Sequence, residues 1–143
     1  MRKSERCQIN THEPGAIEKK LFQDFNERIK LYRLLSSAEN PSHIDDIERQ
    51  IIDRCGMIPS STKTLLTNHR MQIQCYQFGI YSIEEKEQKW VINYRTHTLI
   101  PHSIAKVLMQ NISVRIHGPK SISLCQSKFP QLDHVHHFLQ QHH

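Results

Sequence analysis

The stretch Ile52-Asp53-Arg54-Cys55-Gly56-Met57-Ile58-Pro59 contains the clearest helix end in the chain. Gly56 can adopt the left-handed conformation that closes an α-helix, and Pro59 prevents the helix from continuing. Ser42 stands three residues before Asp45 in a capping-box arrangement, which predicts where this helix begins. The apolar residues in between recur at helical spacing, at Ile44, Ile47, Ile51, Ile52 and Cys55. We therefore expect an amphipathic helix over residues 42–55.

A longer helix is predicted upstream of this one. Apolar residues at positions 17, 21, 22, 25, 29, 32 and 35 follow helical spacing, and Asp24 and Arg28 are placed to form an i,i+4 ion pair. This helix is expected to run from Ala16 to Ala38. The preceding residues 1–15 are mostly polar and end in Pro-Gly, so we interpret them as a flexible leader.

The segment after Pro59 predicts a third helix with two apolar sides. Ser60 or Ser61 can cap its start, and Gly79 ends it. One side carries Leu65, Leu66, His69, Ile73 and Tyr76, and the second carries Met71, Cys75 and Phe78. An apolar surface this wide indicates burial against two neighbours.

After Gly79 the pattern changes to the two-residue period of β-strands. Trp90, Ile92 and Tyr94 alternate with other residues, and 80–85 is a plausible partner strand. The pattern continues with a short helix from Ser103, alternation at Ile112, Val114 and Ile116, a turn at Gly118-Pro119, a strand with Ile122 and Leu124, and a helix from Pro130. Three helices followed by a β-β-α-β-β-α unit predict an α+β fold with a small, mainly antiparallel sheet, as one domain over residues 16–143.

The composition excludes several classes of function. The four glycines lie at 15, 56, 79 and 118, so neither a phosphate-binding loop nor a dinucleotide fingerprint can be written in the 143 residues. The four cysteines form no CxxC pair, and no segment is apolar enough to span a membrane. The net charge of +5 permits a polyanion partner, but charges of both signs are interleaved. We expect a cytoplasmic protein without enzymatic activity.

The histidine-rich C-terminus raises the question of a metal site. His134 and His137 are three positions apart on a predicted helix and could reach one ion, with His97, His102 or His117 as a third ligand. No cysteine or carboxylate has matching spacing, and apolar packing explains the helix. We therefore expect neither a metal nor another cofactor.

A nucleophilic site is equally weakly indicated. Cys75, His69 and Asp53 supply the residue types of a nucleophile, a base and an orienting acid. Cys75, however, lies on an apolar helical face, where a buried, unreactive cysteine is the ordinary case. No catalytic residue is expected.

Nucleic-acid binding is the alternative to a protein-interaction function. Lys86, Lys89 and Arg95 near the first predicted hairpin could place cations beside the ring of Trp90. Trp90 and Ile92 are two positions apart in the predicted strand and point to the same face, so we expect the Trp90 ring to face the core and not the solvent. A duplex-binding domain would normally show a denser basic stripe.

Several blocks of the sequence together resemble one known family. They are residues 52–59, Leu65-Leu66 with Arg70, and Phe78-Gly79-Ile80, preceded by Arg28, Ile29, Tyr32 and Arg33 and followed by the turn Ile116-His117-Gly118-Pro119. In this order and spacing, over residues 26–139, they resemble the C-terminal domain of the bacterial transcription-repair coupling factors. Cys55 stands where the family has an aromatic ring, Gln50 where it often has a glutamate, and Leu34 where a basic residue is common.

The resemblance implies a regulatory domain of a larger machine. Full-length family members are ATP-driven DNA translocases that displace stalled RNA polymerase and recruit nucleotide excision repair. In the family this domain packs on an N-terminal UvrB-like module and covers the surface that would otherwise bind the damage-recognition protein UvrA. The domain contains none of the motor, so DNA is reached only through the full-length protein.

The resemblance also implies roles for individual residues. The expected partner surface is the polar face of the second helix, with Asp46, Arg49, Gln50 and Asp53, although a solvated helix face would carry the same residues. The motif residues expected to be structural are Arg28, Tyr32, Asp53, Arg54, Gly56, Pro59, Gly79, Gly118 and Pro119. Of these, Asp53 and Arg54 are expected to fix the helix junction through charge-assisted hydrogen bonds.

Overall fold

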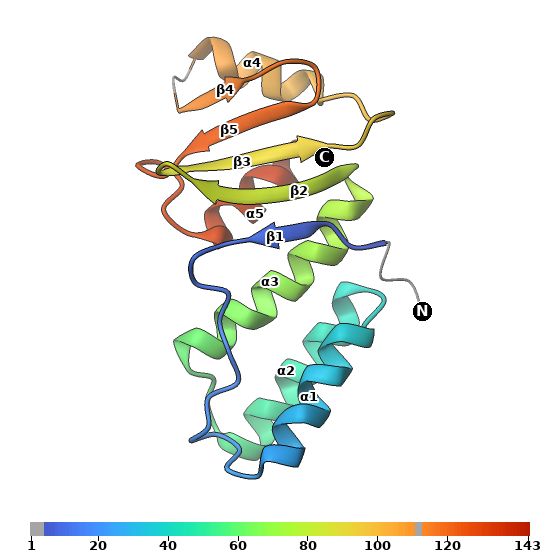
Figure 1. Cartoon of the computed structure of the whole chain (residues 1–143), viewed down its shortest axis with the longest axis vertical. Helices are drawn as coiled ribbons and strands as arrows, with labels where there is room; N and C mark the ends of the chain where they lie inside the picture. Colours follow the sequence, from blue (N-terminus) through green and yellow to red (C-terminus); the bar gives the residue numbers. More distant parts are fainter. Residues whose placement is uncertain (1–4, 111–112) are drawn as a thin grey trace.

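The described part of the chain forms a five-stranded sheet and helices that pack beside it (Figure 1). The computed structural model describes residues 5–110 and 113–143, so residues 1–4 of the predicted leader and Ile112 of a predicted strand lie outside it. In chain order the elements are β1 (Gln8–Asn10), α1 (Phe25–Ser37), α2 (Pro41–Cys55), α3 (Ser60–Gln77), β2 (Ile80–Lys86), β3 (Lys89–Tyr94), α4 (His102–Gln110), β4 (Val114–Ile116), β5 (Ser121–Cys125) and α5 (Leu132–Gln141). Apart from β1, the order of three helices followed by β-β-α-β-β-α is the predicted one, and the α+β fold is confirmed.

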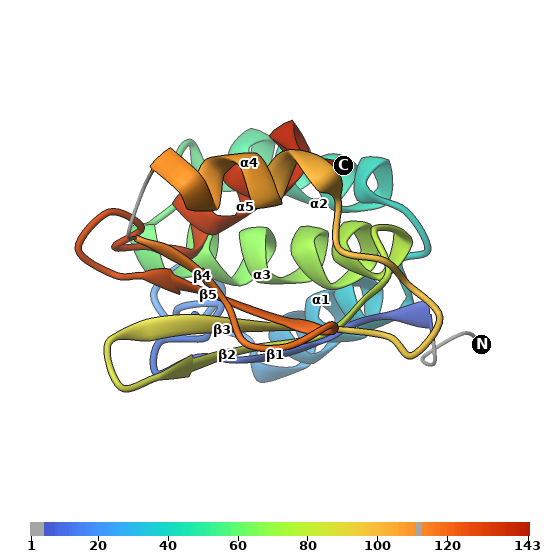
Figure 2. The ribbon, with the colours of Figure 1, turned by 90° about the horizontal axis from the view of Figure 1, so that it is seen from above.

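The strands form one sheet in the order β1-β2-β3-β5-β4. Only the β1–β2 pair is parallel among these neighbours, so the sheet is mainly antiparallel, as predicted. Trp90, Ile92 and Tyr94 of β3 are buried, as alternate residues on one face of a strand should be. Figure 2 shows α3, α4 and α5 on the same side of the sheet, which is where these buried side chains pack.

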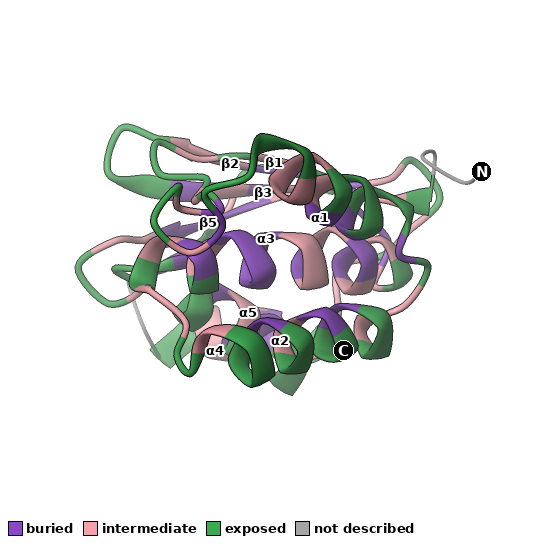
Figure 3. Ribbon diagram, turned by 90° about the horizontal axis from the view of Figure 1, so that it is seen from below, coloured by how far each residue is buried: buried purple, intermediate pink, exposed green. Residues whose placement is uncertain are grey.

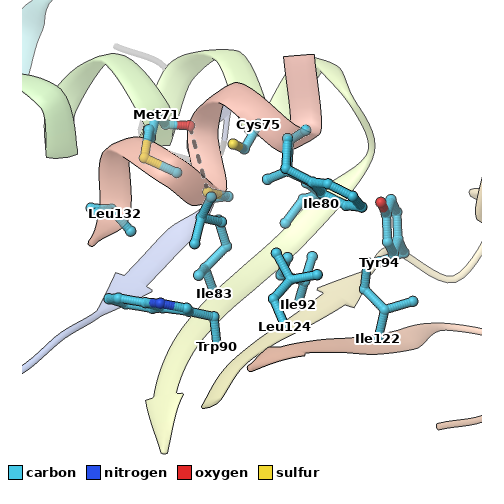
Figure 4. Packing of buried hydrophobic residues seen from close by; sticks show 14 of the residues in the cluster. Met71, Cys75, Ile80, Ile83, Trp90, Ile92, Tyr94, Ile122, Leu124 and Leu132 are labelled. Carbon is cyan, nitrogen blue, oxygen red and sulfur yellow. Dashed lines mark hydrogen bonds between the residues drawn. The ribbon is translucent and has the colours of Figure 1, made fainter. Parts of the chain in front are cut away.

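Helix α3 packs against the sheet on one side and against α1 and α2 on the other. Met71 and Cys75 belong to the buried cluster of the sheet, α4 and α5, part of which is drawn in Figure 4. Leu65, Leu66 and Ile73 belong to the buried cluster of α1 and α2. In Figure 3 α3 lies in the middle of the molecule, while α2 turns an exposed face outward. The predicted burial of this helix against two neighbours is confirmed.

The prediction of a flexible leader is wrong for its described residues, because a strand forms there. β1 pairs in parallel with residues 82–84 of β2, and Cys7 directly before it is 2% exposed. Three residues with one apolar side chain, Ile9, are too short a pattern to predict a strand. The open edge of β2 supplies the pairing, and the sequence of the leader alone does not show that edge.

Helix α1 begins at Phe25, and residues 16–24, which were predicted to be helical, are not. Asp24 is the N-cap, and its carboxylate accepts the backbone N–H of residue 26 at 2.9 Å. Ile17 and Phe22 are buried in the core nonetheless. Arg28 does not pair with Asp24 but donates to the carbonyl of Phe22 at 2.6 Å. Apolar spacing alone cannot distinguish a helix from an irregular segment that buries the same side chains.

Helix α2 is capped at its start by a different residue from the one predicted. The N-cap is Asn40, whose side-chain oxygen accepts the backbone N–H of residue 43 at 3.2 Å, and Pro41 occupies the first helical position. The Ser42–Asp45 capping box is therefore wrong, because Ser42 already lies inside the helix. The predicted end is confirmed, since Gly56 has a left-handed φ of +82°.

The remaining boundaries differ from the predictions by small shifts. β2 and β3 are joined by a tight turn at Glu87 and Gln88, both with positive φ. α4 begins just before the predicted cap at Ser103, and α5 begins just after Pro130. Helix ends commonly shift by a residue or two, because the flanking residues satisfy the terminal backbone groups in several ways.

Two glycines with the same φ should respond differently to alanine. Gly15 and Gly56 both have φ of +82°, but a Cβ at Gly15 would lie 2.4 Å from backbone atoms of Ser61 and Leu65, whereas a Cβ at Gly56 meets nothing within 4 Å. Gly56→Ala should lower the free energy of unfolding by about 1 kcal/mol, through backbone conformation alone. Gly15→Ala should lower it by more than about 2 kcal/mol, because the segment must move away from α3. Urea unfolding measures both, and equal losses would contradict the close approach of residue 15 to α3.

Candidate protein-interaction surface

The residues expected at a partner interface lie on one exposed stripe of α2. Their spacing of three and four positions aligns them along the helix. We call them the α2 stripe: Asp46, Arg49, Gln50 and Asp53, all exposed. The opposite side of the helix is anchored by three buried isoleucines, Ile44, Ile47 and Ile51. The core therefore fixes the direction in which the stripe faces.

The charges of the stripe are only partly compensated. Asp46 and Arg49 form an ion pair with each other. The Asp53 carboxylate makes no hydrogen bond or ion pair with any other residue in the described ranges. A carboxylate in the last turn of a helix opposes the helix dipole, so the stability of α2 does not explain Asp53. This carboxylate is available to a partner.

A shallow groove between α1 and α2 borders the stripe at Gln50. Its volume is about 160 Å³, and Leu34 of α1 and Arg54 of α2 also line it. Leu34 is 39% exposed, and near the end of α2 Ile52 and Met57 are 43% and 64% exposed. Exposed apolar side chains beside polar and charged groups are what a non-obligate protein interface requires.

Arg54 joins the end of α2 to the start of α1. Its guanidinium donates to both carboxylate oxygens of Glu27 on α1, at 2.7 and 2.8 Å, and lies 5.1 Å from the centre of the Phe22 ring. The hydrogen bond to Glu27 and its charge raise the pKa of Arg54. Cys55 is half-buried, and its Sγ donates to the carbonyl of Leu21 at 3.8 Å. Arg54 therefore links the end of α2 to the start of α1, and the expected side-chain hydrogen bonds of Asp53 and Arg54 within the 52–59 helix junction are not found in the described part of the chain.

The other motif residues lie at connections between elements. Tyr32 Oη accepts the backbone N–H of residue 17 at 2.8 Å, which ties α1 to the segment before it. Gly79 has φ of +87°, and its N–H donates to a carbonyl in the last turn of α3. Pro59 directly precedes α3, and Gly118 and Pro119 lie in the turn between β4 and β5. These positions fit structural roles.

The structure does not bring the possible catalytic residues together. Cys75 is 0% exposed between α3 and the sheet, where a hydrogen bond with Cys7 and burial raise its pKa. His69 lies against Arg6, and Asp53 lies on the outer surface of α2. A thiol with a raised pKa inside an apolar cluster is a poor nucleophile.

The histidines do not form a metal site in the described part of the chain. No group of three or more His, Cys, Asp or Glu side chains there is placed to hold an ion. His134 Nδ1 accepts the backbone N–H of Gln131 at the start of α5, and His117 Nε2 lies 2.7 Å from Ser123 Oγ. These imidazoles take part in local hydrogen bonds instead.

The stacking ring required for the nucleic-acid alternative is buried. Trp90 is 3% exposed, and its indole N–H donates to the carbonyl of Phe129 at 2.7 Å. Lys86 and Lys89 are exposed beside the β2–β3 turn, but Arg95 lies over the ring of Tyr76. The expectation that Trp90 faces the core is confirmed, and the alternative that places these cations beside an exposed Trp90 ring is not supported.

The family model of the TRCF domain matches residues 12–116 of this chain. The chain belongs to the TRCF domain family. The matched range contains the α2 stripe and the α2–α3 junction and ends before the turn at Gly118 and Pro119. The resemblance that the sequence blocks indicated is confirmed.

The curated relatives are named as transcription-repair-coupling factors. The chain is 26% identical over 125 residues to the one from Escherichia coli (strain K12), covering 86% of this chain and 11% of that protein. For the one from Haemophilus influenzae the identity is 22% over 117 residues, covering 80% of this chain and 10% of that protein. This chain therefore spans about a tenth of the length of these relatives.

A solved structure shows the same fold. It is described as the crystal structure of the C-terminal domain of transcription-repair coupling factor, and it matches with a TM-score of 0.75 over 94% of this chain and 87% of that chain. The sequence identity is 15%, so this match supports the fold alone. In the described ranges no helix combines the length and the apolar character that crossing a bilayer requires.

Sequence reasoning missed Arg6, which joins three parts of the fold. Its guanidinium donates to the carbonyls of Leu35 and Ala38, at 2.7 and 2.8 Å, at the end of α1. It also donates to Gln72 Oε1 at 3.0 Å and lies 2.9 Å from His69 Nδ1, both on α3. These bonds satisfy carbonyls that a helix end leaves open. No local pattern signals this role, because the partners are 29 to 66 positions away in the sequence.

His69 should remain neutral at pH values where an exposed histidine is charged. Burial, together with the charge of Arg6, lowers its pKa to about 4. The unfolded chain protonates this imidazole near pH 6.5, so the unfolded state binds more protons and the protein loses stability as the pH falls from 6.5 towards 4. An NMR titration of the histidine ring carbons measures the value. A pKa of His69 near 6.5 would contradict the Arg6 contact and the burial.

Proposed function

We propose that this chain is a non-catalytic regulatory domain acting in transcription-coupled nucleotide excision repair. Its surface packs on the UvrB-like module of a coupling factor and controls access of UvrA. RNA polymerase and DNA are reached only through the full-length protein, in the cytoplasm. The observation that carries this proposal is the TRCF family match over residues 12–116, which contains an exposed α2 stripe on a rigidly anchored helix.

The chemistry of α1 and α2 supports a protein partner for this surface. The stripe combines an internal ion pair, the amide of Gln50 and the uncompensated carboxylate of Asp53. Exposed Leu34 and Ile52 add apolar area that a partner can cover. A surface of mixed charge with apolar groups at its edge favours a protein over a polyanion, which would require a basic stripe.

The proposed lack of catalysis has separate support. The glycine spacing admits no phosphate-binding loop anywhere in the sequence. Because the relatives are about eight times as long as this chain, their motor has room outside the matched region. A domain without a motor can still regulate one by covering or exposing a binding surface.

Charge reversal at the stripe tests the proposed interface. The titration partner is the UvrB-like N-terminal module of a coupling factor from the same organism, with affinity measured by fluorescence anisotropy at low salt. Asp53→Lys should weaken binding by about tenfold or more, since the reversed charge meets the group that paired with the carboxylate. Folding should be unaffected, because a cation suits the last turn of α2. Glu87→Lys, in the β2–β3 turn, is the matched control and should leave the affinity unchanged.

Two results would contradict the proposal. One is the absence of binding to the UvrB-like module at high micromolar concentrations, even at low salt. The other is equal affinity of the Asp53→Lys and Glu87→Lys variants, which would place the contact elsewhere. Duplex DNA is included as a competitor, because a steep loss of DNA affinity with rising salt would identify a nucleic-acid-binding domain instead.

A further inference from the structure

A cavity of about 550 Å³ lies between the N-terminal segment, α3, β2 and the end of β3, and its described lining residues do not include the α2 stripe. Its lining includes two arginines, Arg6 and Arg95, and the side-chain amides of Asn10 and Gln72. Among the described residues that line it, none is an aspartate or a glutamate. The cavity is therefore positively charged and rich in hydrogen-bond donors, and its volume falls in the range of small-molecule sites.

Arg95 is a half-buried cation that has no carboxylate partner in the described part of the chain. Its guanidinium makes no hydrogen bond or ion pair with another described residue, and its Nη1 is the one buried side-chain nitrogen or oxygen without a hydrogen-bond partner in the described ranges. In contrast, Arg49, Arg54 and Arg70 each pair with a carboxylate. A buried charged donor that lacks an acceptor costs free energy, which an anionic ligand would offset.

The Arg95 side chain is held in position before any ligand binds. Its guanidinium carbon lies 3.9 Å from the centre of the Tyr76 ring on α3. The backbone N–H of Arg95 donates to the carbonyl of Gly79 at 2.8 Å, and its carbonyl accepts the N–H of Thr98 at 3.0 Å. A planar guanidinium stacked on a ring keeps its edge free for the oxygens of a phosphate or carboxylate.

Arg6 strengthens the positive potential without competing for the ligand. Four contacts, to Leu35, Ala38, Gln72 and His69, already occupy its terminal nitrogens. Gln72 uses its oxygen to accept from Arg6, which leaves its amide nitrogen as a donor. Arg6 therefore holds one side of the cavity in place, whereas Arg95 has a guanidinium N–H donor that is free to bind a ligand.

A β-bulge places an aromatic ring at the same cavity. The register of β2 against β3 shifts between Ile80 and Ser82, so Tyr81 has no partner opposite it. Its side chain is 56% exposed and lines the cavity. Bulges of this kind redirect a side chain away from the regular face of a strand. An exposed tyrosine beside an unpaired arginine can stack on a planar ring.

We propose that this cavity binds a nucleoside phosphate, with the phosphate oxygens on Arg95 and the base against Tyr81. The ligand supplies both the acceptor that Arg95 lacks and a ring for the exposed face of Tyr81. A free nucleotide and a nucleotide within a single strand present the same two groups. This inference is independent of the proposed partner of the α2 stripe. It gives Arg95 a ligand-binding role that does not require the ring of Trp90, which is buried.

The test is a titration of the whole chain followed by NMR of backbone amides and arginine side chains. The probes are adenosine 5′-monophosphate, inorganic phosphate and adenosine. The monophosphate should shift the signals of Arg95 and Tyr81 in a saturable way, phosphate alone should shift Arg95 more weakly, and adenosine should bind at least about tenfold more weakly than the monophosphate. A short single-stranded oligonucleotide forms the second arm. Binding at least about tenfold tighter than the monophosphate assigns the source to a strand, and similar affinity assigns it to free nucleotide.

Variants separate the site from general electrostatics. Arg95→Gln should weaken binding of the monophosphate by about tenfold or more, and Arg95→Lys, which keeps the charge and lacks the planar fork, should weaken it by an intermediate factor. Arg115→Gln is the matched control, because Arg115 is an exposed arginine on β4 outside the cavity lining, and the affinity should stay unchanged. Equal effects of Arg95→Gln and Arg115→Gln would overturn the proposal. So would the absence of saturable shifts, or an acidic peptide that binds Arg95 more tightly than the nucleotide does.

Discussion

The burial of α3 on two sides is the constraint on which the rest of the structure depends. One side of this helix completes the core of the sheet through Met71 and Cys75, and the other completes the core of α1 and α2 through Leu65, Leu66 and Ile73. The α2 stripe and the cavity beside Arg95 are both positioned relative to α3, so their geometry depends on how this one helix packs.

The N-terminal segment adds a second connection between the same two cores. β1 extends the sheet beside β2, Arg6 binds the end of α1 and the middle of α3, and Thr62 of α3 donates to the carbonyl of Ala16 at 2.9 Å. A short segment thus fastens the sheet, α1 and α3 with hydrogen bonds instead of a large apolar area. The same segment forms one wall of the positively charged cavity, so it has both a structural role and the proposed binding role.

The sequence was sufficient for the main helices and strands because their signals are local. The three-and-four spacing of the isoleucines of α2, the glycine at its end and the alternation around Trp90 each predict an element that the structure contains. The irregular path of residues 16–24 and the strand β1 could not be predicted in this way, because the core and the edge of β2 determine them. The same limit applies to the sites. The α2 stripe follows from helical spacing. Three other features depend on residues distant in sequence: the pairing of Arg54 with Glu27, the contacts of Arg6 and the unpaired hydrogen-bond donor of Arg95.

The domain exposes a surface on α1 and α2, and α3 connects these helices to the sheet. Denaturant unfolding of Leu66→Ala tests the shared role of α3 most directly, because Leu66 is fully buried in the α1–α2 core while the sole tryptophan, Trp90, lies in the sheet core. The account predicts that Trp90 fluorescence and far-ultraviolet circular dichroism give one coincident transition, destabilised by about 2–5 kcal/mol. A Trp90 transition that stays at the wild-type midpoint while helical signal is lost earlier would show that the two cores unfold independently, and it would contradict the central role of α3.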